Sequence, residues 1–160
     1  MSGRSGSGPA RLVAGDPAPD FTLPDTHGTP VVLSALRGGP VAVVFVPFAF
    51  SGICTSELCE LRDAIEDFEA AGVRLLVVSC DAMFTLRAWA EHAGFGFELL
   101  SDFWPHGAAA RAFGVFDEAA GIALRGSFLL DADGIVRWSV LNPRGKARDL
   151  GEYRAALAAL

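Results

Sequence analysis

The sequence contains few basic residues, few cysteines and no long apolar segment. No apolar run approaches the roughly 20 residues that a membrane-spanning helix needs. The 13 Lys and Arg against 19 Asp and Glu give a net charge of −6, which disfavours non-specific nucleic-acid binding because that requires a basic surface. The 3 cysteines are an odd number without zinc-type spacing, which favours redox chemistry over a disulfide framework.

The N-terminal segment lacks the apolar core of a signal peptide and is rich in Gly and Ser. We expect residues 1–11 to form a flexible tail and residues 12–160 to form one domain. The domain is globular rather than disordered, because 51% of all residues are hydrophobic and 20% are charged. Without an export signal we expect a cytoplasmic protein, in which cysteines are more often catalytic than structural.

The pattern of apolar residues predicts an α/β domain with a mixed sheet and helices on both faces. Two buried strands joined by a helix predict a right-handed βαβ unit with parallel strands. At one end Ser34 is predicted to cap a short helical turn, and at the other Tyr153, Leu157 and Leu160 are predicted to face inward. The expected elements are a hairpin over 21–33, strands 41–46, 73–80 and 97–101, helices 55–68, 83–92 and 107–113, a hairpin over 127–140 and a helix over 150–160.

The loop from Pro47 to Cys54 joins the most apolar strand to the following helix. Pro47 ends the strand because it cannot donate to a ladder, and Cys54 falls at or near the first turn of the helix. The unpaired N–H groups and the dipole of a helix start favour an anion, so the pKa of the thiol there should fall below about 8.5. A reactive cysteine is one interpretation, and a buried, inert core cysteine is the alternative.

Other titratable residues have ordinary interpretations. Cys80 ends a buried strand and is predicted to be inert. His27 is expected at an exposed hairpin tip, and His106 at a helix start or on the surface, with no second histidine or cysteine at metal spacing. We therefore expect no metal site.

The same stretch resembles the peroxiredoxins, which carry Pro-x-x-x-Thr/Ser-x-x-Cys at a strand-to-helix loop. Pro47, Ser51 and Cys54 match that motif position for position, and the segment Arg125–Asp131 is similar to the family's second active-site segment. The resemblance covers about residues 12–160 and implies a thioredoxin-like fold. Ser101–Gly107 resembles the AhpE-type branch, which has one active cysteine. Residues 54–63 instead resemble the PrxQ branch, also called bacterioferritin comigratory protein.

The resemblance implies a role for each matched residue. Cys54 is the nucleophile, and Arg125 faces it as a cation that supports the thiolate and holds a peroxide oxygen. Read from the sequence alone, Arg125 could equally form a surface salt bridge. Ser51 supplies a hydroxyl to the peroxide or thiolate, and Pro47 shields the site from water. Glu57 either orients an arginine or is simply solvated.

Cys59 lies five residues after Cys54, where the PrxQ resemblance implies a resolving cysteine. In an intact helix the two Cα atoms are about 8.5 Å apart, beyond the roughly 7 Å limit for a disulfide. An intramolecular disulfide therefore requires the first turns of the helix to unwind. The alternative is a helix-face cysteine that never pairs, as in the AhpE-like scheme.

These features together predict a thiol-dependent peroxidase that reduces hydrogen peroxide and organic hydroperoxides through a cysteine sulfenic acid. No metal, haem or flavin is needed. The expected partners are the peroxide, a thioredoxin-, glutaredoxin- or mycoredoxin-like reductant or a low-molecular-weight thiol, and a second copy in a homodimer. Phe48, Phe50 and Trp104 are interpreted as core or dimer-contact residues. A thiol–disulfide oxidoreductase and a redox sensor are the rival hypotheses.

Overall fold

The structure is a computed structural model, and it describes residues 10–51, 58–59, 62–63, 65–142 and 150–160. Cys54 and Glu57 lie outside the described residues, as do residues 1–9 of the expected tail. The loop that begins at Pro47 is described as far as Ser51, and helical residues are described again from Leu58.

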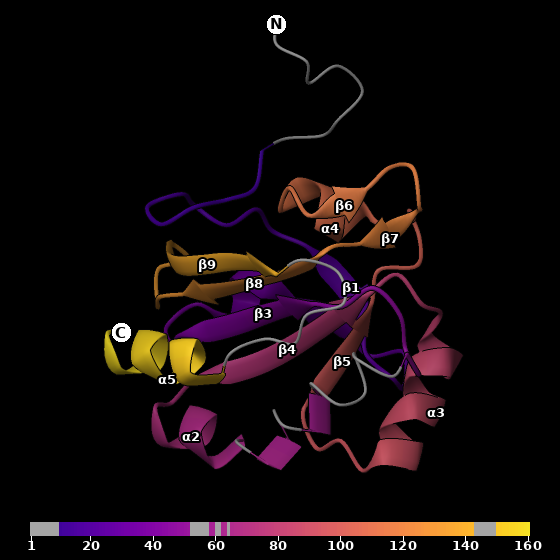
Figure 1. Cartoon of the computed structure of the whole chain (residues 1–160), viewed down its shortest axis with the longest axis horizontal. Coiled ribbons are helices and arrows are strands. Elements are labelled where there is room, and N and C mark those ends of the chain that lie inside the picture. Colours follow the sequence, from indigo (N-terminus) through magenta and orange to yellow (C-terminus); the bar gives the residue numbers. More distant parts are fainter. Residues whose placement is uncertain (1–9, 52–57, 60–61, 64, 143–149) are drawn as a thin grey trace, which may run out of the picture.

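A five-stranded mixed sheet forms the centre of the fold, in the order β5-β4-β3-β8-β9 (Figure 1). Strands β3, β4 and β5 are parallel, whereas β8 is antiparallel to β3, and β9 is antiparallel to β8. The five strands are β3 (Val41–Phe45), β4 (Arg74–Ser79), β5 (Glu98–Ser101), β8 (Arg125–Leu130) and β9 (Val136–Asn142). Because β3 is buried along its whole length, its continuous apolar sequence is the pattern that a central strand requires.

Two short hairpins lie outside the central sheet. The first pairs β1 (Thr22–Pro24) with β2 (Pro30–Val32), and the second pairs β6 (Phe116–Asp117) with β7 (Ile122–Ala123). The second hairpin was not predicted, because strands of two residues are too short for an alternating pattern to be visible.

The helices are short and lie beside the sheet (Figure 1). Residues 58–59 and 62–63 are helical and precede α2. Gly94 ends α3 in the left-handed conformation, as expected for a glycine at this position. The elements are the 3₁₀ helix η1 (Leu33–Leu36) and the α-helices α2 (Ile65–Ala70), α3 (Met83–Ala93), α4 (Ala108–Ala112) and α5 (Leu150–Ala158).

Alternate side chains of the central strands enter two separate core clusters, as the pleat of a sheet requires. The first cluster takes one face of the sheet together with the β1–β2 hairpin and α4, and includes Val43, Phe45, Val78, Phe113 and Phe128. The second cluster takes the other face together with residues from α2, α3 and α5, and includes Val44, Val46, Leu58, Phe68, Trp89, Leu129, Tyr153 and Leu157. The sheet is therefore covered on both faces, which confirms the predicted α/β class.

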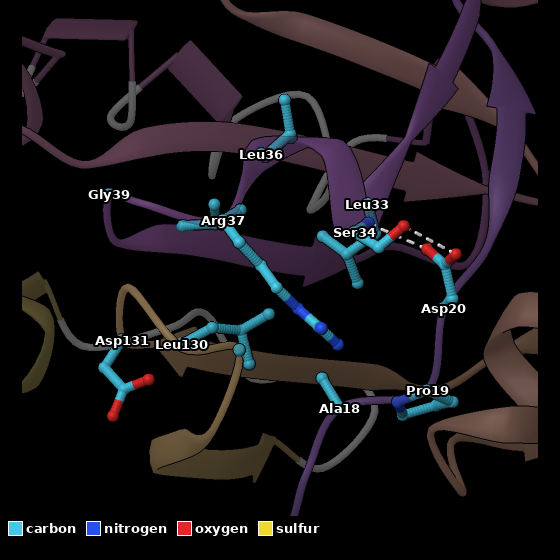
Figure 2. A pocket seen from close by; sticks show the side chains of 12 residues that line it. Ala18, Pro19, Asp20, Leu33, Ser34, Leu36, Arg37, Gly39, Leu130 and Asp131 are labelled. Carbon is cyan, nitrogen blue, oxygen red and sulfur yellow. Dashed lines mark hydrogen bonds between the residues drawn. The ribbon is translucent and has the colours of Figure 1, made fainter.

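Two of the local predictions are wrong. Leu160 is 44% exposed, because α5 ends at Ala158, although Tyr153 and Leu157 are buried as expected. Ser34 lies within η1 and makes no side-chain cap. Its N–H and O–H instead donate to the two carboxylate oxygens of Asp20, each at 2.8 Å (Figure 2). The carboxylate of Asp20 is the stronger acceptor, and it takes both donors of Ser34.

None of the described helices has both the length and the apolar character of a membrane span.

Candidate active site

The candidate site lies at the carboxyl end of β3. The N–H of Val46 donates to the Val78 carbonyl at 2.9 Å, and this bond extends the pairing of β3 with β4 by one residue. Pro47 follows directly, half-buried, and leaves the sheet because it has no N–H to continue the ladder. In parallel sheets this edge is where ligands bind.

Arg125 lies at the same edge, on the neighbouring antiparallel strand. Val44 pairs with Ser127, so continuing each strand by two residues sets Arg125 opposite Val46. Successive side chains of a strand point to opposite faces of the sheet, so Arg125, Ser127 and Leu129 share one face. Because Leu129 belongs to the second core cluster, the Arg125 side chain points to the face of that cluster. Its side chain is only 3% exposed, which excludes the surface salt bridge that the sequence left open.

The loop after Pro47 is anchored by Phe50 and leads to Ser51. Phe50 adopts a left-handed φ of 65°, which is unusual for a large side chain. Its ring lies 6.0 Å from the ring of His92 and 6.3 Å from that of Trp89, both on α3. These contacts fix the direction of the chain into Ser51, which is half-buried. Pro47 and Arg125 therefore lie at one end of the sheet, and Ser51 follows four residues after Pro47.

Cys59 is in the helix that follows the loop. It is partly buried and packs against the second core cluster, and the preceding Leu58 is fully buried. This is the face to which Arg125 points. Cys54 and Glu57 fall in the segment 52–57 between Ser51 and Leu58, outside the described residues.

Cys80 differs sharply from a reactive cysteine. It is buried in the first core cluster, on the opposite face of the sheet from Leu58. Burial, together with charge repulsion from the carboxylate of Asp102, raises the pKa of its thiol to about 12. The thiol is therefore neutral at physiological pH, and the prediction that Cys80 is inert is supported.

His27 and His106 each lie within hydrogen-bond distance of a neighbour that is not one of the candidate site residues. His27 is exposed, as predicted, and its Nδ1 lies 3.1 Å from the Thr26 hydroxyl. His106 is half-buried, and its Nε2 donates to the Gly121 carbonyl at 2.7 Å. Neither belongs to a group of three or more His, Cys, Asp or Glu side chains able to hold a metal within the described ranges.

Sequence reasoning missed two acidic residues close to this end of the sheet. Asp81 follows β4 and accepts a hydrogen bond from the backbone of Ala49, within the active-site loop. Asp102 follows β5, is buried, and accepts the N–H groups of Ala109 and Ala110 at the start of α4. The sequence could have indicated both residues, because each lies just after a buried parallel strand. The carboxyl ends of such strands lie at one edge of the sheet.

Exposed aromatic side chains also follow each of the three parallel strands along the sequence. Phe48 and Phe50 follow β3, Phe84 is the second residue of α3 after β4, and Phe103 and Trp104 follow β5. Phe48 and Phe50 are each 50% exposed and Trp104 is 81% exposed, so none of the three is a buried core residue, contrary to the core interpretation.

A cavity at the opposite end of β3 is unrelated to this site. Leu33, Ser34, Arg37 and Val41 line it, and Figure 2 shows the Arg37 side chain extending into it. Val41 begins β3, whereas Pro47 follows its end, so the length of the strand separates the cavity from the loop.

Comparison with known proteins agrees with this geometry. Residues 14–139 match the AhpC/TSA family. The chain is 47% identical over 150 residues to alkyl hydroperoxide reductase E of Mycobacterium tuberculosis, covering 93% of this chain and 98% of the relative. It is 34% identical to a peroxiredoxin of Thermoplasma volcanium, covering 93% of this chain and 75% of the relative.

The fold is likewise similar to that of solved peroxiredoxins. Peroxidoxin BcpB from Mycobacterium tuberculosis superposes with a TM-score of 0.84 at 31% identity, covering 94% of this chain and 99% of that one. The sheet order, the buried arginine beside the strand-to-helix loop and these relatives agree. The chain belongs to the AhpC/TSA family and is a peroxiredoxin, a thiol-dependent peroxidase.

Proposed function

We propose that Cys54 is the nucleophile of this peroxidase and that its substrates are hydrogen peroxide and organic hydroperoxides. The thiolate attacks one peroxide oxygen and the O–O bond breaks. The cysteine becomes a sulfenic acid, and the other oxygen leaves as water or an alcohol after taking a proton. The observation that carries the proposal is the burial of Arg125 beside the loop that leads to Cys54.

Three residues support this step. Arg125 stabilises the thiolate and the negative charge that develops on the departing oxygen, and its low exposure strengthens both effects. Ser51 donates its hydroxyl to the peroxide or the thiolate. Pro47 covers the thiolate without offering a competing N–H, and Glu57 orients an arginine from the next turn of the helix. Alkyl hydroperoxide reductase E, by its name, acts on alkyl hydroperoxides, which supports an organic substrate.

We further propose that Cys59 resolves the sulfenic acid. Its thiolate attacks the sulfur of Cys54, a disulfide forms, and the hydroxyl leaves as water. An external dithiol, thioredoxin-, glutaredoxin- or mycoredoxin-like, or a low-molecular-weight thiol then reduces the disulfide. Cys59 is only partly buried, which supports its access to a partner once the helix start unwinds.

One observation favours the alternative, in which an external thiol attacks Cys54 directly. Leu58 is fully buried, so unwinding the helix through Cys59 exposes a core side chain. Transferring such a side chain to water costs about 1.5–3 kcal/mol, which opposes the internal disulfide.

A homodimer and a cytoplasmic location complete the proposal. The aromatic residues after β3, β4 and β5 offer an apolar surface beside the active site, and burying it against a second copy accounts for their exposure. Thiol-based reduction of the enzyme requires a reducing compartment, which supports the cytoplasm.

The test is a stopped-flow reaction of the reduced protein with hydrogen peroxide, followed by candidate reductants. Cys54→Ser should abolish the reaction, and Cys80→Ser should leave its rate unchanged because that thiol stays protonated. Mass spectrometry after one equivalent of peroxide should find a Cys54–Cys59 disulfide. A stable Cys54 sulfenic acid with Cys59 reduced would instead establish the external-thiol scheme. Peroxide turnover by Cys54→Ser would refute the assignment of the nucleophile, and insulin reduction without peroxide consumption would favour an oxidoreductase.

A further inference from the structure

Asp81 connects the active-site loop to the central sheet. One carboxylate oxygen, Oδ2, accepts the backbone N–H of Ala49 at 2.8 Å. The same oxygen accepts the Ser79 hydroxyl at 2.7 Å, and the N–H of Asp81 donates back to that hydroxyl oxygen at 3.1 Å. Ala49 lies between Pro47 and Ser51, so this acceptor holds the middle of the loop.

The support behind Asp81 is rigid. Ser79 ends β4 and pairs with Ser101 at the end of β5, and both side chains are buried. The Ser101 hydroxyl donates to the Asp81 carbonyl at 2.6 Å. The backbone and the carboxylate of Asp81 are therefore both fixed by residues of the sheet, which fixes the loop as well.

From these contacts we propose that Asp81 is a positioning residue of the peroxidase reaction. Its carboxylate oxygen holds Ala49 and thereby sets the position of Ser51, three residues before Cys54 in the chain. The proposal rests on the proposed role of Cys54. It adds that the geometry of the loop is imposed from β4, 32 residues along the chain from Ala49.

Two other contacts hold the loop here: Ala49 packs against the second core cluster, and the Phe50 ring lies beside Trp89 and His92. Phe50, the residue after Ala49, is held by its ring. Its backbone has a left-handed φ, which a large residue adopts only when its surroundings impose it. The Asp81–Ala49 hydrogen bond lies immediately before that residue. Its removal should let the backbone at Phe50 relax and shift Ser51, and a displacement of about 1 Å can lower a reaction rate about 100-fold.

Two substitutions separate the hydrogen bond from the charge. Asp81→Ala removes the acceptor, whereas Asp81→Asn keeps one oxygen able to accept from both Ala49 and Ser79. We expect the rate constant for peroxide, measured at a pH where the thiol is fully ionised, to fall about 10- to 100-fold in Asp81→Ala. We expect Asp81→Asn to stay within about threefold of wild type, because the remaining acceptor keeps the loop in place.

A direct readout of the loop does not depend on activity. Hydrogen exchange of the Ala49 amide, measured by NMR, should be slow in wild type and Asp81→Asn, and fast in Asp81→Ala. If Cys54 proves not to be the nucleophile but the Ala49 amide shows these exchange rates, the proposed function is refuted while the anchoring of the loop by Asp81 is confirmed. If Cys54→Ser abolishes the reaction but Asp81→Ala retains the wild-type rate, the function stands and the positioning role is refuted.

Asp131→Ala is the matched control. Asp131 also holds a turn after a strand, accepting the N–H groups of Asp133 and Ile135, but it lies at the other end of the sheet. It should lower thermal stability without changing the peroxide rate constant. The positioning role is overturned if both alanine variants lose rate in proportion to lost stability, or if Asp81→Asn is as slow as Asp81→Ala.

Discussion

The guanidinium of Arg62 donates a hydrogen bond of 2.6 Å to the backbone carbonyl of Ala93, the last residue of α3. This contact attaches the helix that follows the active-site loop to a second helix, three residues after Cys59. Phe68, six residues further on, is buried in the second core cluster. Among the described residues of this helix, Arg62 and Phe68 are thus anchored to other elements, and Leu58 is buried in the second core cluster.

This anchoring predicts where unwinding stops when the Cys54–Cys59 disulfide forms. In the oxidised protein the amides of Leu58 and Cys59 should lose their protection from hydrogen exchange, and the amides of α2 should keep theirs. Exchange measured by mass spectrometry in the reduced and oxidised states checks this boundary. Cys59→Ser treated with one equivalent of peroxide is the control, and its protection should stay that of the reduced protein. Loss of protection through Phe68 on oxidation would contradict the anchoring.

Replacement of Arg125 by Met should raise the pKa of the Cys54 thiol and slow its reaction with peroxide. Removing the buried cation takes away charge stabilisation from the thiolate and from the departing oxygen. We expect the rate constant of the ionised thiol to fall by about 100-fold, beyond what the lost thiolate fraction explains. A pH–rate profile separates the two effects.

The matched control for Arg125 is Arg137→Met on the adjacent strand β9. The Arg137 side chain is 57% exposed and pairs with Asp131 at 2.6 Å, at the end of the sheet away from the loop. Its replacement should leave the pH–rate profile unchanged. If the pH–rate profile of Arg125→Met superimposes on that of wild type, the proposed role of Arg125 in the reaction is refuted.

Much of the fold was predictable because its core strands are unusually apolar. β3 and β4 are buried on both faces, so their sequences are continuous hydrophobic runs. The turns at Gly72 and Gly94 were also predictable, since each adopts a positive φ that glycine tolerates. The burial of Arg125 could not be predicted, because the preceding residues Ala123 and Leu124 fit both a buried strand and an exposed strand end.

The hydrogen bonds of acidic residues lay beyond prediction. Asp81 meets Ala49 across 32 residues and Asp20 meets Ser34 across 14, and such partners depend on the register of the sheet rather than on local spacing. Ser34 has a residue type that favours a helix cap, yet tertiary contact with Asp20 decides its role. The PrxQ-like and AhpE-like segments likewise give opposite indications for Cys59, and only the chemistry of the oxidised protein separates them.

Asp102 should make stability depend on pH. Burial raises the pKa of its carboxyl, although the N–H groups of Ala109 and Ala110 and the charges of His106 and Arg111 act the other way. Since the folded-state pKa exceeds the unfolded value of about 3.9, stability from this group is complete below that value. That stability is lost as the pH rises through the folded-state pKa.

The measurement compares urea unfolding of wild type and Asp102→Asn between about pH 4 and about pH 8. The range begins near the pKa of an Asp carboxyl in the unfolded chain, about 3.9. Asparagine does not ionise, so the free-energy difference between the two proteins isolates this carboxyl from His106 and other groups. Wild type should lose stability relative to the variant as the pH rises. A difference that is constant, or that changes in the opposite direction, would contradict the raised pKa of Asp102.

Gly126→Ala should destabilise the protein, because the backbone beside Arg125 has no room for a side chain. A Cβ atom at this position would lie 2.7 Å from Cγ1 of Val115, well inside van der Waals contact. Both residues belong to the packed interior, and overpacking of this kind costs about 1–3 kcal/mol. Gly96→Ala is the control, since nothing lies within 4 Å of its Cβ position. Urea unfolding should show the loss for Gly126→Ala alone, and the double variant with Val115→Ala should recover part of it. Equal stability of Gly126→Ala and wild type would mean that β8 shifts to admit the methyl group, and the peroxide rate constant should then change because Arg125 moves with it.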